Sequence, residues 1–234
     1  MSEREKILAR VREALKAPAA MPGSHESSAG VPPAKLNAAG TGAPPLARQW
    51  LPKVGESFDE RLALFQKSAA GLKADFQLFA SRDELKTAIA KMSTAENWKH
   101  IASHQGELTD LISAAPGLAI CFTDKNYDVH ELEACDAGIS ECDALIAQTG
   151  TVLVTNRSAG GRALSILPPH HVVLARREQL VADLPAAFEL LKQKYAANYP
   201  SMISFITGPS RTGDIERILV LGAHGPKRLT IFLI

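Results

Sequence analysis

The sequence predicts an α/β domain in which helices flank a largely parallel sheet. From about residue 57 onward, helical and strand-like patterns alternate at short spacing, as in chains whose parallel strands are joined by crossover helices. The chain has 234 residues, of which 46% are hydrophobic, so it can bury one substantial core. The alternation and the available core together favour one domain of this class over residues 51–234.

The first 50 residues predict two segments outside this domain. Within residues 1–17, Ile7, Val11 and Leu15 recur at helical spacing, which indicates a short amphipathic helix. Residues 18–50 are rich in Pro, Gly, Ala and Ser, and this composition predicts a flexible linker. Because nothing local covers the apolar stripe of the helix, we expect it to pack on a partner protein or on a second copy of the chain, as in a homo-oligomer.

Each element of the domain has its own local pattern. Helices are predicted over residues 58–72, after Ser81, and over residues 107–114 and 184–195, and strands over residues 75–80, 100–103, 118–123, 144–147, 151–155, 171–175, 202–207 and 229–234. Ser81 and Glu84 are spaced as in a capping box. The continuous apolar run 118–123 predicts a strand buried on both faces. Phe188 shares an apolar face with Leu191 in the last helix.

Composition and charge argue against several classes of protein. The formal net charge is +1 and Lys and Arg are scattered along the chain, so there is no basic stripe of the kind that binds nucleic acid. No apolar run approaches the roughly 20 residues that span a membrane, and the charged N-terminal residues do not resemble a secretory signal. We therefore expect a cytoplasmic protein, and the odd number of cysteines, 3 in all, suits that reducing compartment.

The sequence contains no motif for a bound redox cofactor or metal. It has no G-x-G-x-x-G after a strand, no phosphate-binding G-x-x-x-x-G-K-[ST] and no G-x-S-x-G. Cys121, Cys135 and Cys142 are spaced 14 and 7 residues apart, whereas iron–sulfur and zinc sites need closer pairs. Cys121 is expected in the core, and the acidic neighbours of Cys142 argue against a nucleophile. We therefore predict no metal and no cofactor in this chain.

Loops next to strand ends carry the polar residues of a candidate ligand site. They contain Gln148, Thr149, Gly150 and Thr151 in the first loop, His170 in the second, and Gly208, Pro209, Ser210, Arg211, Thr212 and Asp214 in the third. In doubly wound sheets, ligands bind beyond the carboxyl ends of the strands, so we expect these loops to meet there around one hollow. His224, in the loop before the last strand, completes the set, although a parallel last strand would favour a structural role for it.

Each loop also has a purely structural interpretation. The first can be a tight turn between two strands. His170 can be a structural histidine, and because adjacent strand residues point to opposite faces, His170 and His171 are not expected to share a metal. In the third loop, N–H groups at a helix start together with Arg211 would attract an anion. The competing interpretation is a capped helix in which Asp214 pairs with Arg211.

Taken together, three segments resemble the lactate utilization protein C family, whose members carry a LUD domain. They are residues 143–154 (DALIAQTGTVLV), 167–173 (LPPHHVV) and 206–226 (ITGPSRTGDIERILVLGAHGP). The resemblance extends over roughly residues 55–234. It implies a Rossmann-like sheet similar to those of glucosamine-6-phosphate isomerase, ribose-5-phosphate isomerase and the CoA-transferases.

The resemblance also implies a function. It implies an accessory role in the oxidation of L-lactate to pyruvate, alongside partner subunits that carry iron–sulfur clusters. In this role we expect the chain to bind a small carboxylate or another anion through Arg211 and nearby backbone N–H groups. Gln148 departs from the family, in which glutamate is common at that position, and an amide cannot accept a proton as a general base would. The alternatives are a free-standing enzyme acting on a phosphorylated sugar or a CoA thioester, and a purely assembly or regulatory module.

Overall fold

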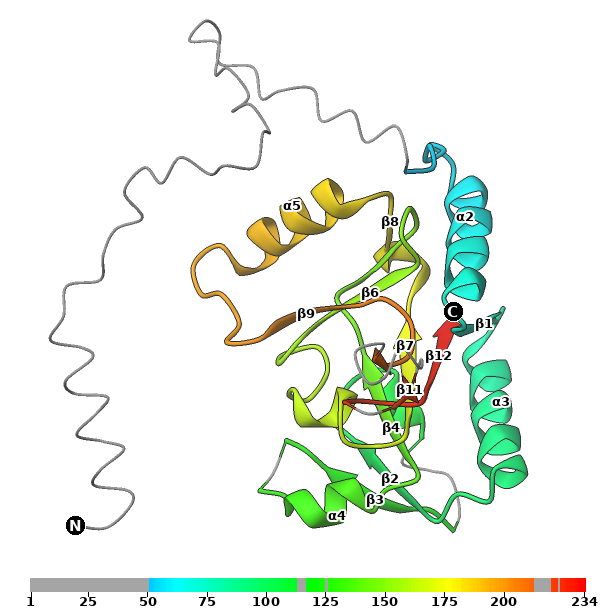
Figure 1. Cartoon of the computed structure of the whole chain (residues 1–234), viewed down its shortest axis with the longest axis vertical. Coiled ribbons are helices and arrows are strands. Elements are labelled where there is room, and N and C mark those ends of the chain that lie inside the picture. Colours follow the sequence, from blue (N-terminus) through cyan, green and yellow to red (C-terminus); the bar gives the residue numbers. More distant parts are fainter. Residues whose placement is uncertain (1–50, 113–116, 125, 213–219, 223) are drawn as a thin grey trace, which may run out of the picture. The chain divides into compact units, whose positions relative to one another are not determined.

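The computed structural model describes residues 51–112, 117–124, 126–212, 220–222 and 224–234. The helix and the linker predicted within residues 1–50 lie outside the described residues. The main sheet has six strands in the order β1 (Asp75–Leu78), β12 (Arg228–Leu233), β7 (His170–Ala175), β4 (Ala137–Glu141), β2 (His100–Ser103) and β3 (Ala119–Phe122) (Figure 1). All neighbouring strands in it are parallel, which confirms the predicted fold class.

Helices cover both faces of the main sheet. The described helices are α2 (Phe58–Gly71), α3 (Arg82–Ala95), α4 (Val129–Glu133) and α5 (Leu184–Tyr195), with short 3-10 turns η1 (Thr109–Leu111), η2 (Ala163–Ser165) and η3 (Arg177–Gln179). Of these, α2 and α3 lie on opposite faces of the main sheet. Side chains of β7 alternate between the faces, so Val173 packs in one core cluster with Phe65 of α2, whereas Leu174 packs in another with Leu85 of α3. None of the described helices is long and apolar enough to cross a membrane.

A second, mixed sheet packs against the main one. It has four strands in the order β8 (Leu180–Val181), β5 (Ala144–Ile146), β6 (Thr151–Thr155) and β9 (Ile203–Ile206). The β5–β8 pair is parallel, and the β5–β6 and β6–β9 pairs are antiparallel. Val152 and Val154 of β6 share a buried cluster with Val173 of the main sheet. Leu153 of β6 packs on the opposite face with Leu191 of α5.

Three local predictions are wrong in part. The apolar run 118–123 contains β3, but this strand is the edge of the described sheet and Ala119 is exposed. Within the described part of residues 107–114, the only helical segment is the 3-10 turn η1. Phe188 is 56% exposed, and its ring contacts that of Phe205 at a centroid distance of 5.3 Å rather than entering the core.

The helix caps also differ from the prediction in one respect. Ser81 Oγ accepts from the Glu84 N–H at 3.2 Å, but Glu84 Oε2 accepts from the N–H of Ala80 and not from that of Ser81. The complete capping box lies at α2, where Ser57 Oγ accepts from the Glu60 N–H and the Ser57 N–H donates to Glu60 Oε2 at 3.0 Å. This second box was not predicted.

Substitution Ser57→Ala is expected to lower the free energy of unfolding by about 1 kcal/mol, because it leaves an N–H of the first turn of α2 without its acceptor. Urea unfolding at pH 7 measures the change. Ser93→Ala is the matched control, since the Ser93 hydroxyl lies inside α3 and donates only to a carbonyl of its own helix. Equal stability of Ser57→Ala and the parent chain would contradict the role of this cap.

Candidate functional site

A cavity of about 300 Å³ lies at the amino ends of β7 and β12. His171 and Leu229, which are register neighbours on these two strands, both line it. The polar residues around it are Ser165, His171, Thr207, Ser210, Arg211 and His224. Its apolar lining includes Ile166, Ile206 and Leu229. A mostly apolar hollow with a few convergent polar groups is typical of a small-molecule site.

Backbone hydrogen bonds tie the loops around this cavity to one another. The Lys227 N–H donates to Pro169 O at 2.8 Å, which joins the loops that precede β12 and β7. The Ser210 N–H donates to Pro226 O at 2.9 Å, and the Gly222 N–H donates to Ser210 O at 3.0 Å. Backbone hydrogen bonds therefore join the loops at Pro169, Ser210 and Pro226, which are far apart in the sequence, around the cavity.

His171 is the most deeply buried polar group of the cavity. It is 1% exposed, and its Nε2 lies 2.8 Å from Ser140 Oγ. Its Nδ1 is buried and has no hydrogen-bond partner among the described residues. Burial, together with the neighbouring His170, lowers the pKa of His171 to about 3, so the ring is neutral at pH 7. A buried polar atom without a partner costs free energy unless a ligand or water satisfies it.

Arg211 places a permanent positive charge at this site. Gly208 has φ +83, and a side chain there would come within 2.8 Å of Leu72 O, so only glycine fits without strain. Arg211 Nη2 lies 3.3 Å from the position of that absent Cβ, so the guanidinium lies beside Gly208. A guanidinium binds carboxylates and phosphates through two parallel hydrogen bonds. The lining of this cavity thus includes both a permanent cation and a neutral imidazole.

Five residues of the predicted ligand set lie around the cavity, namely Gly208, Pro209, Ser210, Arg211 and His224. His224 does so although β12 is parallel to its neighbours. Arg211 and Thr212 form β10 (Arg211–Thr212), which pairs antiparallel with β11 (Val220–Leu221). The helix predicted to follow them falls on residues 213–219, which lie outside the described residues. Asp214 lies outside the described residues.

His170 does not line the cavity. Its Nδ1 lies 3.2 Å from Glu96 Oε2, its Nε2 lies 2.8 Å from Thr230 Oγ1, and its ring meets that of Trp98 edge to face at 5.6 Å. These contacts are on the α3 side of the sheet, whereas His171 faces the cavity on the other side. His170 thus has the contacts of a structural histidine. The prediction that the two rings point to opposite faces is confirmed.

The loop that contains Gln148, Thr149 and Gly150 is also not part of the cavity lining. Gln148 Nε2 donates to Pro52 O at 2.9 Å, and a side chain at Gly150 would come within 2.7 Å of the Ala69 N in α2. The loop is a turn between β5 and β6 that packs against the end of α2. Its link to the cavity is indirect, through a 2.9 Å hydrogen bond between Thr151 Oγ1 and Thr207 Oγ1.

At the carboxyl edge of the main sheet, the carboxylate of Glu141 occupies hydrogen-bond donors that could otherwise bind an anionic ligand. Glu141 ends β4, and its carboxylate accepts from the Leu108 N–H at 2.7 Å and from Arg176 Nη2 at 3.1 Å. The Glu141 N–H in turn donates to His104 Nε2 at 3.0 Å. The expectation that the candidate loops meet beyond the carboxyl ends is therefore wrong, because those that converge do so at the amino ends of β7 and β12.

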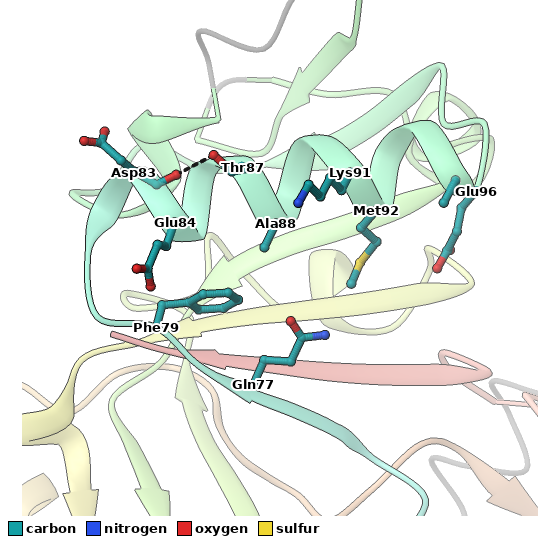
Figure 2. Close-up of a pocket in the computed structure, with 10 residues that line it drawn as sticks. Gln77, Phe79, Asp83, Glu84, Thr87, Ala88, Lys91, Met92 and Glu96 are labelled. Carbon is teal, nitrogen blue, oxygen red and sulfur yellow. Dashed lines mark hydrogen bonds between the residues drawn. The ribbon is translucent and has the colours of Figure 1, made fainter.

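A larger groove of about 770 Å³ runs between α3 and β1 (Figure 2). Figure 2 shows Ala88 and Met92 of α3 pointing toward Gln77 and Phe79 across it. Glu96, at one end, is already bound to Arg228 and His170. The groove is wide but has no buried polar group without a partner among the described residues. The smaller cavity at His171 is therefore the better candidate for a specific site.

The predicted ligand set left out Ser165 and His171, which belong to the second candidate loop, and also Ser140 and Thr207. His171 could have been found from the alternation of β7, because it shares a face with Val173 and Ala175 and therefore points away from His170. Ser140 lies inside a buried strand, and no local sequence signal indicates its contact with His171.

Residues 104–234 match the LUD domain family, which is just over half of the chain. The chain belongs to the LUD domain family. Lactate utilization protein C 1 of Bacillus mycoides (strain KBAB4) is 34% identical over 113 residues, which cover 47% of this chain and 48% of that protein. The match thus spans about half of the relative. Lactate utilization protein C of Shouchella clausii (strain KSM-K16) is 29% identical over 178 residues, covering 73% of this chain and 77% of the relative.

A solved structure supports the fold of this LUD domain. The crystal structure of a DUF162 family protein from Deinococcus radiodurans superposes with a TM-score of 0.61 at 23% sequence identity, over 76% of this chain and 99% of that one. The cavity falls within the matched residues 104–234, since all of its lining lies between Ser165 and Leu229. The predicted family and the predicted fold are both confirmed.

Proposed function

We propose that this chain is a subunit of an L-lactate-oxidising system, in which it binds the small carboxylate and carries no redox cofactor of its own. The names of its relatives, lactate utilization protein C, support this assignment. The observation that carries it is the cavity whose lining includes both Arg211 and the buried His171, a ring with one unpartnered nitrogen.

L-Lactate and pyruvate have the chemistry that these groups would recognise. Each has a carboxylate, which a guanidinium fork binds through two hydrogen bonds. Each also has an oxygen on the adjacent carbon, within reach of a second polar group. A cavity of about 300 Å³ holds such an acid together with a few waters. The buried neutral imidazole supplies one directional hydrogen bond, and Arg211 supplies the charge.

We further propose that partner subunits carry the iron–sulfur clusters that accept the electrons. Oxidation of L-lactate to pyruvate removes a hydride equivalent and a proton, so an electron acceptor is required. The thiols of this chain are poorly suited to bind a cluster, because burial raises the pKa of Cys135 to about 12 and also raises the pKa values of Cys121 and Cys142. Metal ligation requires the thiolate form.

Substitution Arg211→Gln is expected to weaken the binding of L-lactate and pyruvate by about tenfold or more, because the amide cannot replace the charged two-point contact. Isothermal titration calorimetry on the purified chain measures the dissociation constants. Arg82→Gln is the matched control, since Arg82 pairs with Glu107 at the exposed surface and does not line the cavity. Equal affinities of the parent chain and Arg211→Gln would contradict this site.

The assignment to a multi-subunit system is tested by co-purification with candidate iron–sulfur subunits, followed by cluster spectroscopy and lactate-dependent reduction with and without this chain. We expect lactate to reduce the clusters only when the chain is present. Lactate oxidation by the chain alone with an artificial acceptor would overturn the proposal. Binding of a phosphorylated sugar or a CoA thioester, with no affinity for either small acid, would instead favour a free-standing enzyme.

A further inference from the structure

Ser140 and His171 form an isolated buried pair on the adjacent strands β4 and β7. Ser140 is 0% exposed and His171 is 1% exposed, and Ser140 Oγ lies 2.8 Å from His171 Nε2. Within the described part of the chain, this is the only hydrogen bond that either side chain makes. Which of the two groups donates in this hydrogen bond therefore decides whether the buried, unpartnered Nδ1 carries a proton.

A neutral imidazole can share this hydrogen bond in two ways. If Nε2 carries the proton and donates to Ser140 Oγ, the hydroxyl proton of Ser140 has no acceptor and the Nδ1 lone pair has no donor. If Ser140 donates to a bare Nε2, the hydroxyl and Nε2 are both satisfied, and only Nδ1–H lacks a partner. The first arrangement leaves two buried groups unsatisfied and the second leaves one. Because each such group is costly, the second arrangement is the more stable.

The surroundings of the ring disfavour the doubly protonated form. Arg211 and His224 line the same cavity, and His170 precedes His171 on β7. Burial and His170 both lower the pKa of His171. The ring therefore remains neutral near pH 7, and the choice between the two tautomers is the one that determines its hydrogen bonding.

The geometry points to Ser140 as a positioning residue that makes His171 a hydrogen-bond donor, through Nδ1–H, to the ligand in the cavity. The ligand must then place an acceptor oxygen at that point. For the small acids of the proposed function, on which this inference rests, the cavity favours a 2-oxo acid over a 2-hydroxy acid and rejects a 2-amino acid. The chain would accordingly hold pyruvate, the product, more tightly than L-lactate.

Four three-carbon acids separate these interactions, because they share the carboxylate for Arg211 and differ only at the second carbon. Pyruvate presents an acceptor there, and L-lactate an acceptor whose own proton needs another partner. Propionate presents no polar group, and L-alanine presents an ammonium that faces both Nδ1–H and Arg211. We expect pyruvate to bind about tenfold more tightly than propionate, L-lactate to lie between them, and L-alanine to bind most weakly.

The tautomer itself is measured without a ligand. Long-range proton–nitrogen correlation spectra of the full chain, labelled with nitrogen-15 in histidine, show which ring nitrogen carries the proton. We expect Nδ1–H for His171 in the parent chain. Substitution Ser140→Ala removes the donated proton, so the Nε2–H form should become populated and the preference for pyruvate over propionate should shrink to about threefold or less. Ser140→Thr, which retains a hydroxyl, should restore both readouts.

These measurements separate the inference from the function on which it rests. An Nε2–H tautomer in the parent chain, or tighter binding of L-alanine than of pyruvate, would overturn the donor assignment. If Nδ1 carries the proton but none of the four acids binds, the donor assignment stands and the proposed lactate function fails. Should the Ser140 variants fail to fold, the spectrum and the acid series of the parent chain still decide the question.

Discussion

Substitution Asp143→Ala is expected to lower the free energy of unfolding by about 3 kcal/mol. Asp143 is 2% exposed, and its carboxylate accepts from Lys194 Nζ, Tyr195 OH and Ser158 Oγ, each at 2.6 Å. Two of these donors belong to α5 and the third to the loop after β6. The carboxylate thus joins the helix to the second sheet, and its removal leaves the buried Tyr195 hydroxyl without its main acceptor.

Urea unfolding at pH 7 measures this loss. Asp143→Asn retains an acceptor oxygen and the size of the side chain, so a smaller loss is expected. Glu189→Ala is the matched control on α5, since Glu189 pairs only with exposed neighbours of its own helix, and it should change stability by less than about 0.5 kcal/mol. A loss below about 1 kcal/mol for Asp143→Ala would contradict the role of this cluster.

Acid should remove the contribution of Asp143 only at low pH. Burial alone would raise its pKa, but the hydrogen bonds from Lys194, Ser158 and Tyr195 hold the pKa below its ordinary value. A carboxyl group with a lowered pKa contributes stability above its unfolded pKa, about 3.9, and loses it as the pH falls through the folded value. The contribution of Asp143 is therefore intact at pH 5, where that of His171 is already changing.

Acidification from pH 7 to pH 5 is expected to lower the free energy of unfolding by about 2 kcal/mol through His171 alone. Burial lowers the pKa of His171 in the folded chain to about 3, whereas an unfolded histidine titrates near 6.5. Between these values the unfolded chain binds a proton that the folded chain does not. Stability is therefore fully present above about pH 6.5 and falls by about 1.4 kcal/mol for each pH unit below it.

Unfolding curves of the parent chain and of His171→Gln, measured between pH 7 and pH 4.5, test this expectation. The variant cannot titrate at this position, so its stability should fall less steeply with acid. Burial also lowers the pKa of His170, but His170 is present in both chains and cancels in the comparison. His130→Gln, which alters an exposed histidine, should retain the slope of the parent chain. Parallel curves for His171→Gln and the parent would refute the assignment of this acid sensitivity to His171.

The fold class could be predicted from the sequence because it depends on local periodicity. Short apolar runs alternate with helical stretches, and this pattern specifies strands joined by helices before any long-range contact is known. The opposite directions of His170 and His171 followed from the same alternation along a strand. These features require no knowledge of which strands are neighbours.

The position of the site could not be predicted, because it depends on strand order and on pairings between distant segments. Arg211 pairs with Leu221 in a short ribbon, and no local pattern at Ser210 indicates this pairing. Residues 118–123 have the apolar composition of a buried strand, yet β3 lies at the edge of the described sheet. The Glu141 side chain fills the carboxyl edge, and that contact joins residues more than 30 positions apart in sequence, Glu141 and Leu108.

The Glu141 carboxylate has a consequence for the range of molecules that this scaffold can accept. It already satisfies amide hydrogens of the turn that starts at Leu108 and is neutralised by Arg176. To bind at this edge, the phosphate of a nucleotide would have to displace the Glu141 carboxylate from these amide hydrogens and from Arg176. We therefore expect no nucleotide phosphate at this edge, and the cavity at the amino ends of β7 and β12 remains the candidate site for a smaller anion.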